Sequence, residues 1–233
     1  MISSKTMDEI CSVLDTYKGR DKVIRTLCYT ARLVAGLTSD KDLESKLMAV
    51  SKHLSATRTT LRLMDDIPLL KSSLQYGLGK EENNAVMATL GVTTNTIDMS
   101  YLVIEKLGWL AEYGLVSGVD RTKCGTLTSA CWLASVYLTL IRTIRSLYQT
   151  RRMIEDLKSQ NEPQTNVFLQ KLQAKEKFQM ITCVRLSLDI VHAVSTLPKG
   201  FLWSSSLKTW QVGLVGTLSS VLGLYQIFAK KNL

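Results

Sequence analysis

The residue types that most often carry out catalysis or bind metals are few in this sequence and lie far apart. His53 and His192 are the two histidines, and no cysteine or carboxylate cluster has the spacing of a metal site. The segment Gly77–Lys80 lacks the longer glycine spacing and the hydroxyl after the lysine that a phosphate-binding loop needs. No serine lies in a nucleophile-elbow pattern. We therefore expect no catalytic residue, no metal site and no cofactor, and we predict that the chain is not an enzyme.

Other charged or reactive side chains also have structural interpretations. Asp65 and Asp66 precede a proline and are predicted to cap a helix, because acidic residues favour the positive end of the helix dipole. Arg185 and Asp189 are predicted to pair on one helix face. The five cysteines are scattered and odd in number, which favours reduced, packed thiols over a disulfide framework. They are Cys11, Cys28, Cys124, Cys131 and Cys183.

Composition narrows the range of partners. Lys and Arg number 29 against 20 Asp and Glu, and the formal net charge of +9 suits either nucleic acid or an anionic membrane surface. The basic residues are spread along the chain without a recognised nucleic-acid-binding motif, so we expect no nucleic-acid partner. Hydrophobic residues make up 45% of a chain in which 21% of residues are charged, which indicates that the apolar residues are concentrated in a few segments.

Long helices are the elements expected to position these side chains. Only 3 prolines and 13 glycines interrupt the chain, and the predicted fold class is all-α. A first helix is predicted over 6–17 and ends at Lys18-Gly19, and a second is predicted over 21–37. A further helix is predicted over 84–112.

The third predicted helix, Leu43–Met64, carries one narrow apolar stripe opposite a basic face. Its stripe positions alternate in steps of four and three, and they are Leu43, Leu47, Val50, Leu54, Thr57, Leu61 and Met64. Between Ser45 and Met64 every charged residue is basic, and these residues are Lys46, Lys52, Arg58 and Arg62. Such a helix can lie in an anionic membrane interface, or it can pack in a helical bundle with its lysines solvated. The pattern alone favours bundle packing.

Two uncharged runs are candidates for transmembrane helices. Thr209–Ala229 lies between Lys208 and Lys230 and has interfacial aromatic residues near both ends, and crossing a bilayer needs about 20 helical residues. Cys124–Ile141 is shorter and contains several hydroxyl groups, so a transmembrane helix and a buried core helix are both compatible with it. The predicted architecture is a helical membrane protein with an N-terminal amphipathic helical bundle and one or two transmembrane helices.

Small residues recur along the second run at the spacing that allows two membrane helices to approach closely. We predict a self-association face made of Gly213, Gly216, Ser219, Ser220 and Gly223. The run is followed by Lys230-Lys231-Asn232-Leu233, in which the two lysines match a dilysine signal read by coatomer. A positive membrane flank is the alternative interpretation of these lysines, and the sequence favours it.

Four regions follow from these elements. They are an N-terminal amphipathic helical region over 1–112, a first membrane or hydrophobic helix over 113–145, a basic amphipathic helical region over 146–200, and a C-terminal transmembrane anchor with its tail over 201–233. The third region is too long for its charge to fix its orientation. Arg185, Asp189 and His192 on a semi-apolar helix of this region leave open the alternative of a small-metabolite channel or carrier.

Five short blocks occur in one order along the chain. They are Gly19–Leu27, Arg58–Asp66, Gln75–Gly79, Leu197–Trp203 and Val212–Ser220. Together they resemble the peroxin-eleven family, the peroxisomal membrane proteins that elongate the organelle before division. The second and third blocks resemble the gamma type of that family. Residues 142–176 match poorly, so the role of that segment stays open.

The resemblance implies a multi-pass or single-pass protein of the peroxisomal membrane that has cytosolic termini and promotes membrane elongation and peroxisome division. It implies that the helix Leu43–Met64 inserts into the membrane, which reverses the preference for bundle packing. The inserting residues are Leu43, Leu47, Val50, Leu54, Leu61 and Met64, and the lipid phosphates are contacted by Lys46, Lys52, Arg58 and Arg62. The implied partners are an anionic phospholipid membrane, other copies of the chain, related family members, fission adaptors and a dynamin-type GTPase.

Overall fold

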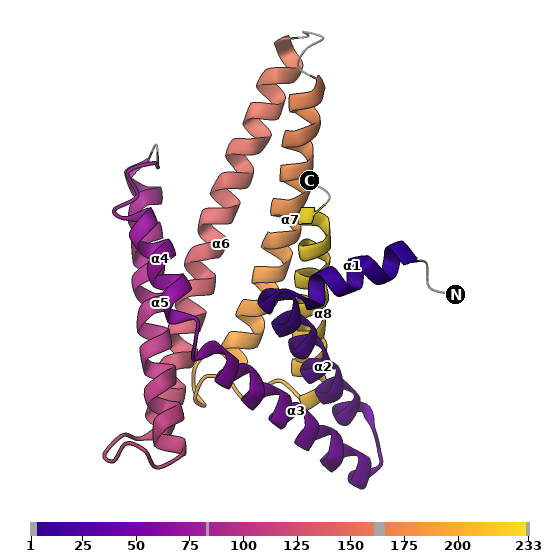
Figure 1. The fold of residues 1–233 in the computed structure, drawn as a ribbon, viewed down its shortest axis with the longest axis vertical. Coiled ribbons are helices and arrows are strands. Elements are labelled where there is room, and N and C mark those ends of the chain that lie inside the picture. Colours follow the sequence, from indigo (N-terminus) through magenta and orange to yellow (C-terminus); the bar gives the residue numbers. More distant parts are fainter. Residues whose placement is uncertain (1–3, 83, 161–165, 232–233) are drawn as a thin grey trace.

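The computed structural model describes residues 4–82, 84–160 and 166–231, and within these ranges it contains helices and turns but no β-strand (Figure 1). The helices are α1 (Ser4–Leu14), α2 (Tyr17–Leu37), α3 (Lys41–Arg62), α4 (Asp66–Tyr76), α5 (Ala85–Glu112), α6 (Arg121–Gln160), α7 (Asn166–Ser195) and α8 (Thr209–Lys231). The predicted all-α fold class is confirmed.

Polar side chains in front of the helices explain several of these bounds. Four helices, α2, α3, α5 and α6, begin after a side-chain oxygen that accepts a hydrogen bond from a backbone N–H of the first turn, which otherwise has no partner within the helix. The capping residues are Thr16, Asp40, Asn84 and Asp120. The starts of these helices are therefore determined by local sequence.

The predicted break at Gly19 is wrong, because Gly19 lies inside α2. The side chain of Thr16 caps α2 by accepting a hydrogen bond from the Gly19 N–H at 3.1 Å. Glycine is needed here because α1 approaches closely: a Cβ atom at Gly19 would lie 1.9 Å from the Val13 carbonyl oxygen. The residue permits a tight turn between α1 and α2 and does not end a helix.

The connection between α3 and α4 also differs from the prediction. Helix α3 ends before Met64, so this residue of the predicted stripe lies beyond the helix. The side chain of Asp65 makes no capping hydrogen bond and instead accepts one from the Tyr17 hydroxyl at 3.1 Å. Asp66, in the first turn of α4, forms an ion pair with Lys106 of α5. The two acids connect neighbouring helices, which the sequence interpretation as caps missed.

The longest elements form an antiparallel hairpin of α6 and α7, with α4 and α5 on one side and α1, α2, α3 and α8 on the other (Figure 1). The Gln179 side chain donates to Ser146 Oγ at 2.7 Å, and Arg151 Nε pairs with Glu176 at 2.7 Å, so contacts pair early α7 residues with late α6 residues. The described part of α6 continues past residue 145, so the predicted hydrophobic segment and the start of the basic region share one helix.

The buried core is small and has two main parts. One lies where α2, α7 and α8 meet and includes Cys28 of α2, Val194 of α7 and Val212 of α8. The other lies along α5 and α6 and includes Leu102 and Val136. Many large apolar side chains elsewhere are exposed to the surroundings of the chain. Because burial of apolar surface is the main stabilising contribution to folding, such exposure indicates that a membrane or a partner protein covers these side chains.

Helices α6 and α8 are the two described helices that are long and apolar enough to cross a membrane. Within the most apolar window of α6, 6% of residues are buried inside the chain, against 39% for α8. A core helix of a soluble protein would be mostly buried, so the alternative of a buried core helix for Cys124–Ile141 does not fit. Leu127, Tyr137 and Ile144 of α6 are more than half exposed, while most other apolar side chains of this helix are partly covered by its neighbours.

Candidate functional site

The apolar stripe of α3 is only partly covered by the rest of the protein. Leu43, Val50 and Leu61 are 42%, 49% and 36% exposed, while Leu47 and Leu54 are half-buried. Met64 is 80% exposed in the turn after α3. Leu43, Val50 and Leu61 are therefore the members of the predicted membrane-inserting set that the rest of the protein leaves most exposed within α3.

The basic residues of α3 divide into two pairs in the fold. Arg58 Nε donates to Asp21 of α2 at 2.8 Å, and Arg62 Nε donates to Glu105 of α5 at 3.0 Å. These four side chains are largely shielded from solvent, so the two arginines fix α3 between α2 and α5. The acidic partners lie on other helices, and this is why α3 had the pattern of an uncompensated basic helix in the sequence.

The other two cations of α3 are exposed. Lys46 pairs with Asp42 one helical turn earlier, and Lys52 forms no ion pair with any described residue. Exposed ion pairs contribute at most about 1 kcal/mol, so Lys46 can exchange Asp42 for another anion at little cost. Contact of all four basic residues with lipid phosphates stays a prediction, and Lys46 and Lys52 are accessible for it in this conformation.

The predicted self-association face of α8 lies against α2 within the same chain. A Cβ atom at Gly213 would lie 2.4 Å from the Leu33 backbone nitrogen, and a Cβ atom at Gly216 would lie 2.4 Å from the Tyr29 ring. Further along the same face, Ser219 and Ser220 are fully buried and Gly223 lies near Lys22 and Arg185. The small residues allow α2 and α8 to pack closely, and a second copy would reach this face only after α2 has left it.

The opposite face of α8 is apolar and exposed. Leu214, Leu218, Val221 and Tyr225 repeat in steps of four and three, which places them on one side of the helix. Helix α8 thus has an inner face of small residues that contacts α2 and an outer face of large residues. The outer face is available to lipid or to another transmembrane helix.

A buried polar cluster connects α2, α7 and α8. Asp189 Oδ1 accepts from Arg25 Nη2 at 2.5 Å and from Ser219 Oγ at 2.5 Å, while Arg185 Nη1 lies 3.3 Å from Asp189 Oδ2. Arg185 Nε also donates to Gln226 at 3.0 Å. A buried carboxylate is tolerated only when it is paired and hydrogen-bonded, and Asp189 meets both conditions.

The sequence predicted one contact of this cluster and missed the others. The Arg185–Asp189 pair is confirmed, because residues four apart on a helix are neighbours. Arg25 and Ser219 were missed, since no local pattern links them to Asp189. At Arg25 and at Ser219, a polar residue on an otherwise apolar helix face could have indicated a buried polar contact.

The directions of three helices constrain how the chain can cross a bilayer. Trp132 of α6 contacts His192 near the end of α7, and Asp189 of α7 contacts Ser219 of α8, so α7 is antiparallel to both neighbours. Helices α6 and α8 therefore run in the same direction (Figure 1). If α6 and α8 both cross a bilayer, α7 must cross it in the opposite direction. A charged residue inside a membrane is tolerated when it is paired, and Asp189 of α7 is paired.

His192 is buried between aromatic residues. Its Nε2 atom and the Tyr29 hydroxyl are 2.6 Å apart, and its ring lies edge-on to Trp132 with 5.5 Å between the ring centroids. The imidazole connects α7 to α2 through this hydrogen bond.

The cysteines, the possible metal ligands and the C-terminal lysines can also be compared with the structure. The five cysteines form no disulfide in the structure. Cys28 is buried, with its thiol 3.2 Å from the Ser51 carbonyl oxygen, but Cys11 is exposed, so the predicted packing does not hold for Cys11. Within the described residues no group of three or more His, Cys, Asp or Glu side chains could hold a metal ion. The backbone of α8 extends through Lys230 and Lys231, but their side chains and the last two residues lie outside the described part.

Comparison with known proteins gives matches over nearly the whole chain. The family model described as Peroxisomal biogenesis factor 11 (PEX11) matches residues 7–228. Human Peroxisomal membrane protein 11C is 32% identical over 230 residues, which cover 95% of this chain and 94% of that protein. Mouse Peroxisomal membrane protein 11C is 29% identical, with 94% and 93% covered.

A plant relative is more distant. Peroxisomal membrane protein 11E of Arabidopsis thaliana is 22% identical over 222 residues, which cover 94% of this chain and 90% of that protein. No solved structure matches the chain. The similarity therefore includes the N-terminal helices, the α6–α7 hairpin and α8 together and is not limited to one segment.

Proposed function

Since this chain belongs to the peroxisomal biogenesis factor 11 family, we propose that it shapes the peroxisomal membrane and thereby promotes organelle elongation and division. The predicted resemblance is confirmed, and the relatives named 11C fit the predicted gamma type. The chain is a peroxisomal membrane protein with a role in peroxisome biogenesis. Membrane insertion by α3, self-association and recruitment of fission factors are the finer parts of the proposal.

The exposed stripe of α3 is the observation that supports membrane shaping most strongly. Leu43, Val50 and Leu61 face away from the fold on an otherwise well-connected helix. Moving such a side chain fully into an apolar phase stabilises by about 1.5–3 kcal/mol. An amphipathic helix inserts roughly 5–10 Å deep, at the boundary of headgroups and acyl chains. Insertion into one leaflet expands that leaflet and bends the membrane.

Positive charge on α3 also favours its contact with the membrane. Lys46 is exposed beside the stripe, and a basic residue near an anionic surface contributes on the order of 1 kcal/mol. Lys52 is exposed on the opposite side of α3. Arg58 and Arg62 hold α3 to α2 and α5, so we propose that they orient the stripe in the folded chain and contact phosphates once their acidic partners are displaced. This favours an anionic phospholipid membrane as the binding surface.

Helix α8 is the proposed anchor. It contains the uncharged Thr209–Ala229, 21 residues long, and its outer face is apolar. We propose that copies associate with each other and with related family members through α8, either along the outer stripe or along the small-residue face after α2 has moved. Cytosolic termini, fission adaptors and a dynamin-type GTPase belong to the proposal because of the family resemblance alone. Coatomer binding rests on the dilysine pattern Lys230-Lys231 together with a cytosolic C-terminus.

The channel alternative has weaker support. Arg185 and Asp189 bind each other and residues of α2 and α8, and His192 is hydrogen-bonded to Tyr29. Groups that saturate one another in a packed interior are poorly placed to line an aqueous path.

Reconstitution of the full chain into liposomes that contain an anionic phospholipid tests membrane shaping. We expect the wild-type protein to tubulate them and the Val50→Glu/Leu61→Glu variant to fail, because two carboxylates would replace exposed stripe residues. Ser45→Glu/His53→Glu adds the same charge at exposed positions of α3 outside the stripe and should tubulate like wild type. Tubulation by the stripe variant at the wild-type level would rule out the proposed insertion.

A further inference from the structure

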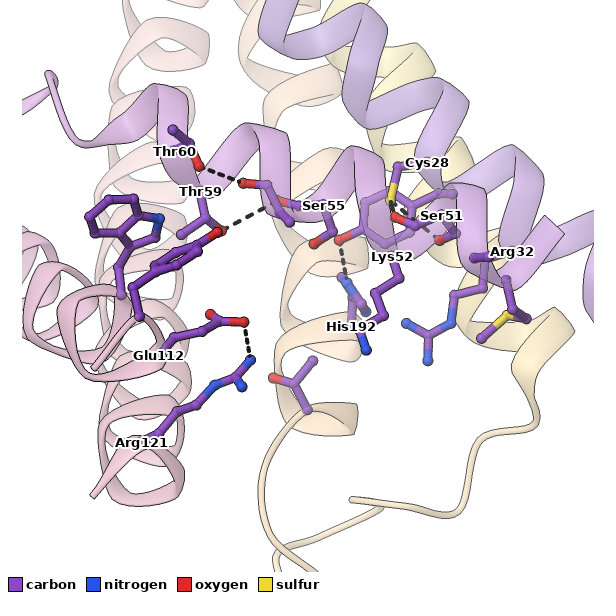
Figure 2. A pocket seen from close by; sticks show the side chains of 17 residues that line it. Cys28, Arg32, Ser51, Lys52, Ser55, Thr59, Thr60, Glu112, Arg121 and His192 are labelled. Atoms are coloured by element: carbon purple, nitrogen blue, oxygen red, sulfur yellow. Dashed lines mark hydrogen bonds and ion pairs between the residues drawn. The ribbon is translucent and has the colours of Figure 1, made fainter. Parts of the chain in front are cut away.

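A pocket of 660 Å³ lies between α2, α3, the turn from α5 to α6 and the end of α7 (Figure 2). Its α3 lining includes Lys52, Ser55 and Thr59. At about 100° per residue, these positions lie on the side of α3 away from the apolar stripe. The pocket is therefore a separate feature from the proposed membrane-inserting edge, and its volume is typical of small-ligand sites.

The pocket has an excess of positive charge. Arg32 of α2 and Lys52 of α3 point toward the same part of it (Figure 2), and neither forms an ion pair with a carboxylate of the described chain. The lining contains one acid, Glu112, which already pairs with Arg121 at 2.7 Å. Two cations without a protein counter-ion thus face one cavity, an arrangement that favours an anionic ligand.

One donor in this pocket has no acceptor. The Nε atom of Arg32 is buried, and no described residue accepts a hydrogen bond from it. Buried donors nearly always have a partner, and an unpaired one calls for a specific explanation. A guanidinium offers parallel N–H groups that match the oxygen atoms of a carboxylate or phosphate.

The rest of the pocket is neutral and is held in place by contacts within the fold. His192 and Tyr29 hydrogen-bond to each other at 2.6 Å. Trp109 and Tyr113 lie in contact with a ring-centroid separation of 4.7 Å and provide an aromatic wall across the cavity. The pocket therefore combines a cationic end with an aromatic side, which suits an anion attached to a less polar group.

We propose that this pocket binds a phosphate group, carried either by a phospholipid headgroup or by a free phosphate compound. Arg32 Nε and the rest of its guanidinium donate to phosphate oxygens, and Lys52 supplies the second positive charge. A phosphate group carries three strong acceptor oxygens and more than one negative charge, so it can accept from Arg32 and pair with Lys52 at the same time. The proposal does not depend on membrane bending, because it uses the other side of α3.

The test is thermal unfolding of the full chain in neutral detergent at constant ionic strength. The two phosphate probes are inorganic phosphate and dihexanoyl-phosphatidic acid, and dihexanoylglycerol is the control lipid without a phosphate. We expect at least one phosphate probe to raise the midpoint of unfolding in a saturable manner. A rise with the lipid alone identifies the headgroup as the source, and a rise with inorganic phosphate shows that the phosphate group is sufficient.

Single-residue variants test whether the probe binds in this pocket. Arg32→Gln should shift the titration to at least about tenfold higher ligand concentration, since a charged hydrogen bond is lost. Ser55→Phe should obstruct the pocket without changing charge and should weaken binding to a similar extent, which keeps the test valid if Arg32→Gln does not fold. The control Arg152→Gln removes an exposed guanidinium from α6 and should bind like wild type.

Three results would overturn the proposal. They are the absence of any shift with both phosphate probes, a shift with dihexanoylglycerol as large as with phosphatidic acid, and wild-type titration by folded Arg32→Gln or Ser55→Phe. The Val50→Glu/Leu61→Glu variant should still bind phosphate, so loss of tubulation and loss of phosphate binding are separable outcomes.

Discussion

Arg25 of α2 and Asp189 of α7 form a buried ion pair, with 2.5 Å between Nη2 and Oδ1 although 164 positions separate the two residues in the sequence. Both side chains are less than one tenth exposed, and the same carboxylate accepts a hydrogen bond from Ser219 of α8. The pair thus joins the N-terminal helices to the anchor. Because α3 packs on α2, this contact and the direct packing of α2 on α8 together position α3 relative to α8.

Replacing Asp189 by Asn should destabilise the fold strongly. Arg25 and Arg185 would remain at the site without a negative partner, and removing one member of a buried pair costs about 3–5 kcal/mol. Chemical unfolding in detergent measures the change. Asp156→Asn, an exposed carboxylate on α6, is the matched control and should stay within about 0.5 kcal/mol of wild type. A loss below about 1 kcal/mol for Asp189→Asn would show that the pair does not hold α2 to α7.

Gly216→Leu should disturb the packing of α2 on α8. A Cβ atom there would lie 2.4 Å from the Tyr29 ring, and forcing extra atoms into a packed contact costs typically 1–3 kcal/mol. Gly125→Leu is the control, because a Cβ atom at Gly125 of α6 has open space around it. A clear drop in the unfolding midpoint is expected for the first variant alone, and equal midpoints would contradict the close α2–α8 contact.

Self-association can be located by cysteine crosslinking in proteoliposomes. In this conformation Leu218 faces outward and Ser220 is buried against the fold, so Leu218→Cys should crosslink copies and Ser220→Cys should not. Crosslinking at Ser220→Cys would show instead that α2 leaves the small-residue face, as the predicted association through Gly213 and Gly216 requires. The native protein with its free cysteines provides the background control.

The features predicted correctly from sequence are those encoded by local patterns. The stripe from Leu43 to Leu61 and the uncharged run Thr209–Ala229 follow helical periodicity and length, which act over neighbouring residues. The Arg185–Asp189 pair could be predicted for the same reason. The contact of Asp189 with Arg25 could not be predicted, because α2 and α7 come together only in the folded chain.

The errors also have physical causes. Gly19 resembled a helix terminator, but Thr16 caps α2 and the glycine serves a close approach of α1. Residues 45–62 of α3 contain no acid, yet Asp21 and Glu105 on other helices pair with two of the four basic residues of that stretch. The pocket beside Arg32 was missed because its lining comes from helices distant in sequence.

The depth of Val50 in the membrane tests the central proposal most directly. A nitroxide label at position 50, on a background with the native cysteines replaced, would be compared in proteoliposomes with a label at Ser45, which is exposed on α3 outside the stripe. Insertion predicts that the label at 50 is accessible to oxygen, protected from a water-soluble nickel reagent and roughly 5–10 Å below the phosphates. Equal accessibility of both labels to the nickel reagent would contradict insertion of α3.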